Sequence, residues 1–325
     1  MRGPQRIRVA SRRTDYQFEL RRNITIVRGN SGTGKTTLYD MIAEHTRLGD
    51  ESGVSIQCDK ECVALVDLNW KGQLDDTKDS IVFIDEGASY IASEDFASAI
   101  KKTDNYYVLF TRMDLHQLPY SIDEIYEIKT NGRKYHKLVP MYEADEHHAY
   151  TNFPRRRQAD QFDVLLTEDT KSGLELYAAH FNGTDATCES ATTNAGIYQW
   201  LQDHRGQRVF VIADGAAFGA EAHRVLKMQE LDPQRIAVCL PESFEWLILN
   251  SGLVDADDLA DVLQNTSTNV ESGVYESWEQ FFTEYLKKIT RNTPFEYRKK
   301  RLAPAYQLPE NSQKIVGQVA RGNIQ

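Results

Sequence analysis

The amino-acid sequence predicts an α/β protein with two domains, each built on a mainly parallel sheet. The chain has 325 residues, which is more than a single hydrophobic core usually organises. Short apolar runs such as Ile81–Ile84 and Val209–Ile212 have the length of fully buried strands. Helical stretches separate these runs in both halves, and this order is typical of parallel strands joined by crossover helices.

The first half is expected to begin with an antiparallel hairpin, because residues 5–28 alternate between apolar and polar side chains and end in a strand at 24–27. A helix is predicted over 35–47 and another over 96–102. Strands are predicted at 63–66, 81–84 and 106–110, and a hairpin over 125–141 turns at Asn131-Gly132.

The second half repeats the alternation after a polar stretch at 143–160, which is interpreted as a linker. Strands are expected near 162–166, 187, 209–212 and 236–240, with helices at 171–181, 194–204, 219–230 and 243–250. The expected organisation is therefore a first domain over 1–142, a linker over 143–160, a smaller α/β domain over 161–265 and a helical C-terminal tail over 266–325.

The charge distribution limits the nature of the partners. A net charge of −10 excludes a molecule that binds nucleic acid through its overall charge. Local basic patches can still contact DNA or RNA phosphates, although each patch can equally be a solvated surface. The three patches are the arginines of residues 1–22, then Arg155, Arg156 and Arg157, and finally Lys287, Lys288, Arg291, Arg298, Lys299, Lys300 and Arg301.

Several features favour a cytoplasmic protein without a membrane anchor. No apolar run has the length of a membrane span, and no secretory signal is recognised at the N-terminus. The four cysteines, Cys58, Cys62, Cys188 and Cys239, are scattered and do not suggest a disulfide framework. Zinc is not expected at Cys58 and Cys62, because no second Cys/His pair follows at a usual spacing. Association with a second copy or with a partner protein stays open.

A phosphate-binding motif is the most specific signal in the chain. Residues 29–36 read GNSGTGKT and match GxxxxGK[ST], the P-loop pattern, between a predicted strand and a predicted helix. Glycines let backbone N–H groups turn inward around phosphate oxygens, and the helix N-terminus adds partial positive charge. Lys35 is expected to reach the β- and γ-phosphates of ATP, and the Thr36 hydroxyl to bind Mg²⁺. The expected nucleotide contacts are Gly29, Asn30, Ser31, Gly32, Thr33, Gly34, Lys35, Thr36 and Thr37.

Acidic and basic residues at the ends of the next strands predict hydrolysis. Asp85 and Glu86 follow the apolar run at 81–84, so Asp85 is expected to hold Mg²⁺ and Glu86 to orient or deprotonate the attacking water. Arg112 follows the strand at 106–110 and is expected to stabilise charge in the transition state. The alternative is an ordinary polar strand end. The predicted catalytic residues are Lys35, Glu86 and Arg112.

The second domain carries acids at two strand ends. Glu168 and Asp169 follow one predicted strand and Asp214 follows another, and acids at neighbouring carboxyl ends can converge on a divalent metal. Glu168 and Asp214 are the predicted ligands. Two alternatives remain, namely solvent-facing acids without a metal and a receiver-like domain in which Glu168 and Asp169 pair beside a phosphoacceptor Asp214.

Both halves resemble known families. Residues 5–141 resemble the ATP-binding-cassette group of ATPases through the hairpin, the loop at 29–36 and the Asp85-Glu86 element, although no LSGGQ-type signature is present. The absence of an [NT]KxD motif favours ATP over GTP. Residues 161–250 resemble the Toprim domain, with Glu168 at the family's glutamate and Asp214 at the first aspartate of its DxD motif. Ala216 stands at the second aspartate, and Glu221 is the nearest acid that can replace it.

The resemblance implies an ATPase whose nucleotide state controls a Toprim-like domain that contacts DNA or RNA. Such pairings occur in DNA processing and phage defence, as in the overcoming-lysogenisation-defect ATPase-nucleases. Two other functions are compatible with the motif. One is a small-molecule or nucleoside kinase, and the other is a non-catalytic interaction protein that is switched by bound ATP.

Overall fold

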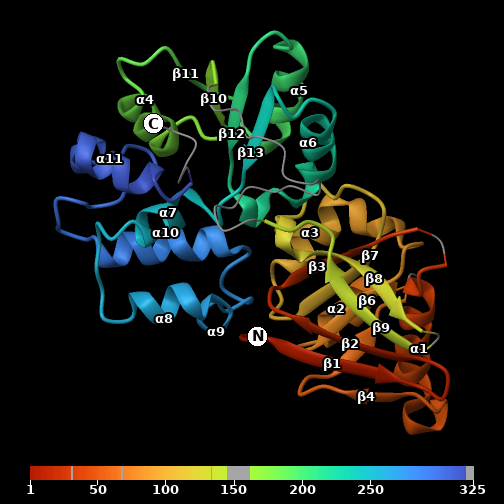
Figure 1. The fold of residues 1–325 in the computed structure, drawn as a ribbon. Coiled ribbons are helices and arrows are strands. Elements are labelled where there is room, and N and C mark those ends of the chain that lie inside the picture. Colours follow the sequence, from red (N-terminus) through yellow and green to blue (C-terminus); the bar gives the residue numbers. More distant parts are fainter. Residues whose placement is uncertain (31, 67–68, 133, 145–161, 320–325) are drawn as a thin grey trace. The chain divides into compact units, whose positions relative to one another are not determined.

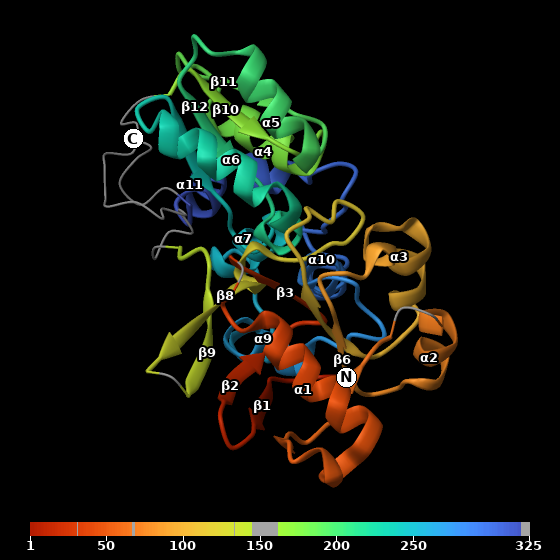
Figure 2. The same ribbon diagram turned by 90° about the vertical axis from the view of Figure 1, so that its right-hand side faces the viewer.

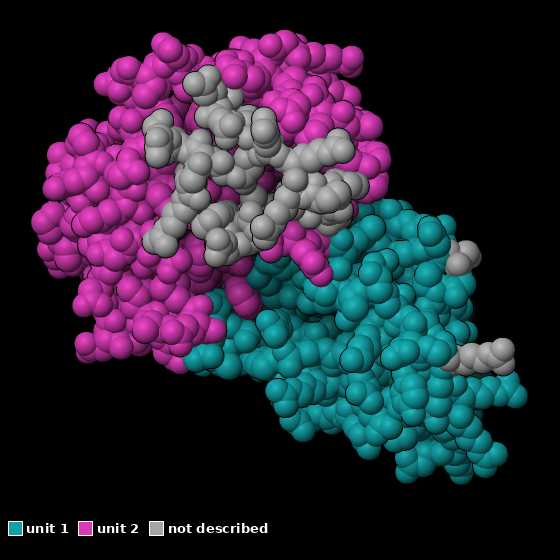
Figure 3. Space-filling view, in the orientation of Figure 1, with its two compact units in different colours: residues 1–141, 265–277 teal, residues 142–264, 278–325 magenta. Residues whose placement is uncertain are grey.

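The computed structural model describes residues 1–30, 32–66, 69–132, 134–144 and 162–319, and it divides the chain into two compact units. Residues 1–141 and 265–277 form the first unit, and residues 142–264 and 278–325 the second (Figure 3). The expected α/β class is confirmed, with a large mixed sheet in one unit and a parallel sheet in the other. The C-terminal region differs from the separate tail expected over 266–325, because its two parts belong to different units. The expected linker at 143–160 lies almost wholly outside the described residues.

The first unit contains a nine-stranded sheet in the order β4-β1-β2-β9-β8-β3-β7-β6-β5 (Figure 1). The two predicted hairpins are confirmed, since β1 pairs with β2 and β8 with β9 in antiparallel register. The strands β8, β3, β7, β6 and β5 are parallel neighbours. The strands are β1 Gln5–Ala10, β2 Asp15–Leu20, β3 Ile24–Arg28, β4 Ser55–Gln57, β5 Cys62–Ala64, β6 Ile81–Ile84, β7 Tyr106–Phe110, β8 Ile125–Asn131 and β9 Tyr135–Pro140.

The central strands are buried on both faces, as their continuous apolar sequences predict. Every residue of β3, β6 and β7 is buried. On one face Tyr39 of α1 packs edge-on against Phe110 of β7, and on the other Phe96 of α3 packs against Tyr107. The helices of this unit are α1 Lys35–Leu48, α2 Trp70–Asp76, α3 Glu94–Ile100 and α9 Thr266–Asn269.

The sheet cannot be flat, because its two outermost strands follow one another in the chain. Residues 58–61 alone join β4 to β5, and such a connection spans at most about 17 Å. A flat sheet in the observed order would separate these strands by about 38 Å. The sheet therefore curls, and α1 contacts β1 as well as β5 and β6 (Figure 2). Leu38, Met41 and Ile42 of α1 lie in one core with residues from both ends of the strand order.

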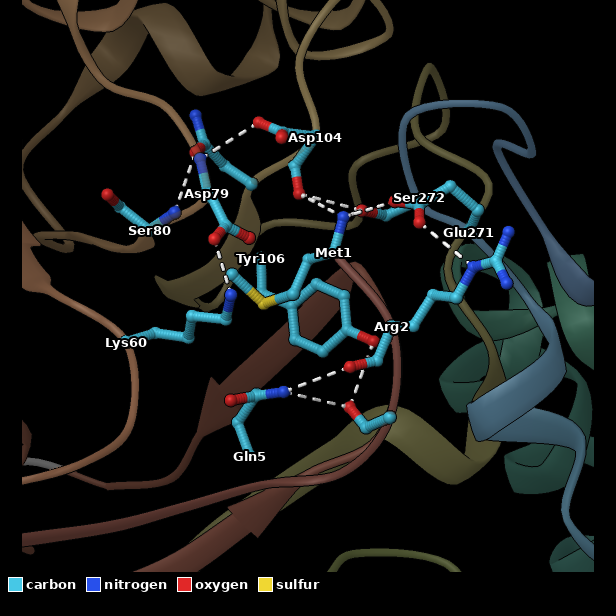
Figure 4. A network of polar contacts seen from close by, with 12 residues as sticks. Met1, Arg2, Gln5, Lys60, Asp79, Ser80, Asp104, Tyr106, Glu271 and Ser272 are labelled. Carbon is cyan, nitrogen blue, oxygen red and sulfur yellow. Dashed lines mark hydrogen bonds and ion pairs between the residues drawn. The ribbon is translucent and has the colours of Figure 1, made fainter.

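Residues 265–277 return from the second unit and are anchored in the first by polar contacts with the N-terminus (Figure 4). The Met1 amine forms an ion pair with Glu271 and donates to the Asp104 carbonyl and the Ser272 hydroxyl, both at 3.0 Å. The Ser272 hydroxyl also donates to the Asp104 carbonyl at 2.7 Å. Further along, Lys101 lies 3.1 Å from Glu276.

The second unit contains a four-stranded parallel sheet in the order β11-β10-β12-β13. The chain moves from β10 outward to β11 and then returns to the other side of β10 at β12. At such a switch point the crossover connections diverge and leave a crevice at the carboxyl ends of the two strands. The strands are β10 Val164–Thr167, β11 Thr187–Ser190, β12 Val209–Ile212 and β13 Ile236–Cys239.

Helices cover both faces of this parallel sheet, with α5 and α6 on one side and α4 and α11 on the other (Figure 1). The helices are α4 Ser172–His180, α5 Asn194–Asp203, α6 Gly219–Leu231, α7 Phe244–Asn250, α8 Leu259–Gln264, α10 Trp278–Ile289 and α11 Pro309–Val316. Across the described parts of the chain, no helix combines the length and the apolar character needed to cross a membrane.

Candidate functional site

The loop at 29–36 joins the buried strand β3 to helix α1, and its glycines adopt backbone conformations that other residues rarely take. Gly29, Gly32 and Gly34 have φ angles of 132°, 83° and 100°. At Gly34 a side chain would also be excluded by contact, because a Cβ atom would lie 2.8 Å from the Tyr16 hydroxyl. The loop conformation therefore depends on glycine at these positions. Ser31 lies outside the described residues.

The Lys35 side chain folds back into this loop. It is only 5% exposed, and its Nζ donates to the carbonyl oxygens of Gly29 at 2.6 Å and Asn30 at 3.1 Å. Thr33 also donates through its hydroxyl to Asn30 O at 3.0 Å. The ammonium group is thus enclosed by the backbone that precedes its own helix.

The structure brings the three predicted catalytic residues together. Strand β6 lies one strand away from β3, with β7 between them, so their carboxyl ends lie at the same edge. Glu86 Oε1 forms an ion pair with Arg112 Nε at 2.7 Å, and Glu86 Oε2 lies 3.8 Å from Lys35 Nζ. Asp85 is half-buried beside it and accepts the Gly87 N–H at 3.4 Å.

A cavity of about 290 Å³ opens over this group. It includes most of the predicted loop residues and four residues that the sequence analysis missed, namely Thr14, Tyr16, Thr130 and His136. Gly29, Asn30 and Asp85, although predicted, do not line it. The full lining is Thr14, Tyr16, Gly32, Thr33, Gly34, Lys35, Thr36, Thr37, Glu86, Arg112, Thr130 and His136.

Tyr16 and His136 form one wall of this cavity. They are register partners on the parallel strands β2 and β9, and their rings stack with centroids 4.4 Å apart. The Tyr16 hydroxyl donates to Gly34 O at 3.1 Å, and His136 Nδ1 lies 3.1 Å from the Thr130 hydroxyl. Burial lowers the pKa of His136, which favours the neutral ring at pH 7. The pair links the hairpin to the loop.

In the second unit, Glu168 and Asp214 lie together at the predicted edge. Thr167 and Ile212 are register partners on β10 and β12, so the residues that follow them meet. The backbone N–H of Asp214 donates to both Glu168 carboxylate oxygens, at 3.0 and 2.9 Å. One Asp214 carboxylate oxygen accepts the Phe244 N–H at 2.8 Å. Their expected closeness is confirmed.

Four further charged residues line a cavity of about 160 Å³ together with this pair, namely Asp169, Glu245, Glu279 and Lys299, and none of them was predicted as a metal ligand. Glu245 is buried and accepts hydrogen bonds from Thr283 at 2.9 Å and from Tyr297 at 2.7 Å. Lys299 pairs with Glu279 at 2.6 Å. We call this cavity the acidic pocket.

The crowding of carboxyl groups changes their ionisation. Burial raises the pKa of Glu168 to about 8. Burial also raises the pKa of Asp214 well above its usual range, and the neighbouring Glu168 carboxylate adds to this shift. The pKa of Glu245 is raised by burial as well. Glu168 therefore keeps its proton at neutral pH, and burial disfavours the charged forms of the other two carboxyl groups.

The acidic pocket offers few ligands for a divalent metal. Within the described ranges, no group of three or more His, Cys, Asp and Glu side chains is placed to hold a metal ion. Ala216 is buried and supplies no ligand. Glu221, considered as its replacement, forms an ion pair with Arg224 and does not line the pocket.

In the receiver-like alternative, Asp169 is one of the two paired acids, but its carboxylate already has backbone partners. The Asp169 carboxylate accepts the N–H groups of Lys171 at 2.8 Å and Gly173 at 2.6 Å, at the start of α4. Asp169 therefore caps the first turn of that helix, and it also lines the acidic pocket.

The first basic patch is largely engaged with acids, and the last is engaged in part. In the first, Arg2, Arg6, Arg8, Arg21 and Arg22 form ion pairs. In the last, Lys287, Arg298 and Lys299 do so. Arg155, Arg156 and Arg157 lie outside the described residues.

The shifted carboxyl groups predict a stability that falls as pH rises. Glu168 binds a proton in the folded state up to about pH 8, whereas an unfolded chain releases it near pH 4.5. The stabilisation is therefore complete below pH 4.5 and is lost as pH approaches 8. The free energy of unfolding of the second unit, measured with a denaturant, should fall by up to about 1.4 kcal/mol per pH unit because of this proton. Glu168→Gln should flatten the pH dependence of the free energy of unfolding. Glu310→Gln, at an exposed glutamate, should leave this dependence unchanged. An unchanged slope in Glu168→Gln would contradict a raised pKa at Glu168.

No protein-family model matches this chain, and the searches of curated proteins and of solved structures also gave no match. The geometry of the two pockets is therefore the basis for assigning a function.

Proposed function

We propose that the first unit binds ATP with Mg²⁺ and hydrolyses it, and that its nucleotide state controls the second unit. The loop at 29–36 carries this proposal, because its left-handed glycines precede a helix N-terminus and enclose the Lys35 ammonium beside Glu86 and Arg112. Inward backbone N–H groups, a helix N-terminus and a lysine together suit a polyphosphate.

The side chains around the cavity have distinct roles in this proposal. Lys35 would contact the β- and γ-phosphates, and the exposed Thr36 hydroxyl would supply a hard oxygen ligand of the kind that Mg²⁺ prefers. Asp85, which lies beside Glu86 but outside the cavity lining, would hold Mg²⁺ through water. When bound, Mg²⁺ neutralises charge on the phosphate oxygens. Arg112 opposes the charge that develops in the transition state.

Glu86 is the proposed group that orients or deprotonates the attacking water. In this structure its carboxylate is held by Arg112 at 2.7 Å and approached by Lys35 at 3.8 Å. The phosphates of ATP compete for both cations. When Arg112 and Lys35 turn to the nucleotide, the Glu86 carboxylate would be released. Glu86 would therefore become an active base only when ATP is bound.

A continuous piece of chain links the two units. Residues 265–277 are held in the first unit by Met1, Asp104 and Lys101. They continue directly into α10, whose Glu279 lines the acidic pocket and whose Thr283 donates to Glu245. A change in the first unit can reach the acidic pocket along this covalent route.

For the second unit we propose a Toprim-like role in which nucleic-acid binding outweighs cleavage. The parallel order β11-β10-β12-β13 and the placement of Glu168 and Asp214 at its switch point support the likeness. The absence of an acid at Ala216 and the raised pKa values of Glu168 and Asp214 weaken the case for metal-dependent cleavage.

The nature of the product separates the rival functions. An ATPase releases ADP and phosphate, a kinase releases ADP and a phosphorylated acceptor, and a non-catalytic switch returns ATP unchanged. Chromatography of the full chain with labelled ATP and Mg²⁺ distinguishes these outcomes. The pairing of Glu86 with cations near the loop favours water activation.

Lys35→Ala should abolish tight ATP binding, because it removes the only lysine that lines the cavity among the described residues. Calorimetry with ATP should show no measurable heat, and a parallel titration with GTP establishes the nucleotide preference of the wild type. Lys71→Ala removes an exposed lysine of the same unit and should bind normally. Unchanged affinity in Lys35→Ala would refute the phosphate site.

Glu86→Gln should retain ATP binding and slow hydrolysis at least about tenfold, since a positioned base typically contributes about 10²–10⁴-fold. The measurement is phosphate release at saturating ATP. Glu94→Gln makes the same charge change at an exposed position and should hydrolyse at the wild-type rate. Wild-type turnover in Glu86→Gln would mean that this carboxylate is not the base.

ATP binding should change hydrogen exchange in α10 and in residues 265–277 by at least about twofold in rate, because that chain connects the units. Mass spectrometry with and without a non-hydrolysable ATP analogue measures the effect. The Lys35→Ala variant is the control and should show none. A response confined to the loop at 29–36 would show that the second unit is not controlled by nucleotide.

A further inference from the structure

Two cysteine thiols meet at the turn that joins the outermost strands of the first unit. The Cys58 sulfur accepts the Lys60 N–H at 3.5 Å, and the Cys62 thiol points to the Lys60 carbonyl at 3.9 Å. Both sulfurs thus contact the backbone of one residue, Lys60, and lie at the same turn. Both cysteines are in the free form.

We propose that Cys58 and Cys62 are a modification site that forms a reversible disulfide with a small-molecule disulfide, such as oxidised glutathione, as the oxidant. The Cys58 thiolate attacks one sulfur of the oxidant and releases one thiol. Cys62 then gives up its proton and attacks the Cys58 sulfur of the mixed disulfide, which releases the second thiol. Two protein thiols are oxidised and one disulfide is reduced to two thiols.

The surroundings assign different roles to the two sulfurs. Cys58 is half-buried and therefore reachable, whereas Cys62 is only 6% exposed. The neighbouring Cys62 thiol and the Lys60 N–H lower the pKa of Cys58 to about 7, which provides thiolate at neutral pH. Cys58 is the attacking thiol, and Cys62 resolves the mixed disulfide.

The other two cysteines lack these conditions. Burial raises the pKa of Cys188 to about 11. Cys239 is buried, with its thiol directed at the Val319 carbonyl at 3.9 Å. They belong to the second unit and serve as internal controls for selectivity.

A disulfide between Cys58 and Cys62 would lie at the junction of β4 and β5. Residues 58–61 close the curled sheet by joining β4 to β5, and β5 contacts α1. A covalent link between Cys58 and Cys62 would restrict this junction. The inference does not depend on ATP binding, since it rests on the turn alone.

The test is a titration of the full reduced chain with glutathione redox buffers, read by intact mass and by alkylation of free thiols. The wild type should lose two hydrogen atoms and two alkylatable thiols, with peptide mapping that links Cys58 to Cys62 and full reversal by dithiothreitol. Cys62→Ser should stop at one glutathione on Cys58. Cys58→Ser should leave Cys62 unmodified, and Cys188→Ser should behave as the wild type.

Three results would overturn the proposal: a wild type that keeps all its thiols, one that accumulates glutathione on Cys58 without closing the link, or a link that involves Cys188, Cys239 or a second chain. Thermal unfolding in reducing buffer checks that each variant is folded. The wild-type measurement decides the matter even if a variant fails to fold.

Discussion

The connection between β4 and β5 is the constraint on which the first unit depends. Because four residues join the two ends of the strand order, the sheet must curl, and α1 fills the space that it encloses. Residues toward both ends of the strand order then contact this helix or the residue before it. From β2, Tyr16 donates to Gly34 O, immediately before α1, and on the other side Tyr39 of α1 donates to Leu65 O, just beyond β5. The loop at 29–36 is therefore positioned by the closure of the whole sheet.

The ion pairs at this loop are suited to exchange. The Lys35 ammonium is buried and needs polar partners, which the two loop carbonyls supply at shorter distances than the Glu86 carboxylate does. Glu86 has its closer contact with Arg112, whose side chain is 57% exposed. An exposed pair of this kind contributes only about 0–1 kcal/mol. A polyanion can therefore displace Glu86 from Arg112 at little cost, which is what the proposed activation of the base requires.

The sequence predicted what depends on neighbouring residues. The loop at 29–36, the acids at the ends of β6, β10 and β12, and the two hairpins are local patterns, and the structure contains each of them. It did not predict the Tyr16–His136 stack, because the parallel register of β2 and β9 joins residues 120 positions apart. Glu245, Glu279 and Lys299 were missed as pocket residues for the same reason, since they come from two helices and a later loop. Nor does any local signal show that residues 265–277 return to the first unit.

The composition of the acidic pocket determines what the second unit can do. A divalent metal is held by ionised carboxylate oxygens, and a carboxyl group that binds a metal must release its proton. Here Glu168 has a pKa of about 8, burial raises the pKa of Asp214, Glu245 is engaged by Tyr297 and Thr283, and Glu279 is paired with Lys299. Protonated carboxyl groups donate hydrogen bonds as well as accept them. Such a pocket is better suited to recognising polar groups than to activating water on a metal, which agrees with the proposed role in which binding outweighs cleavage.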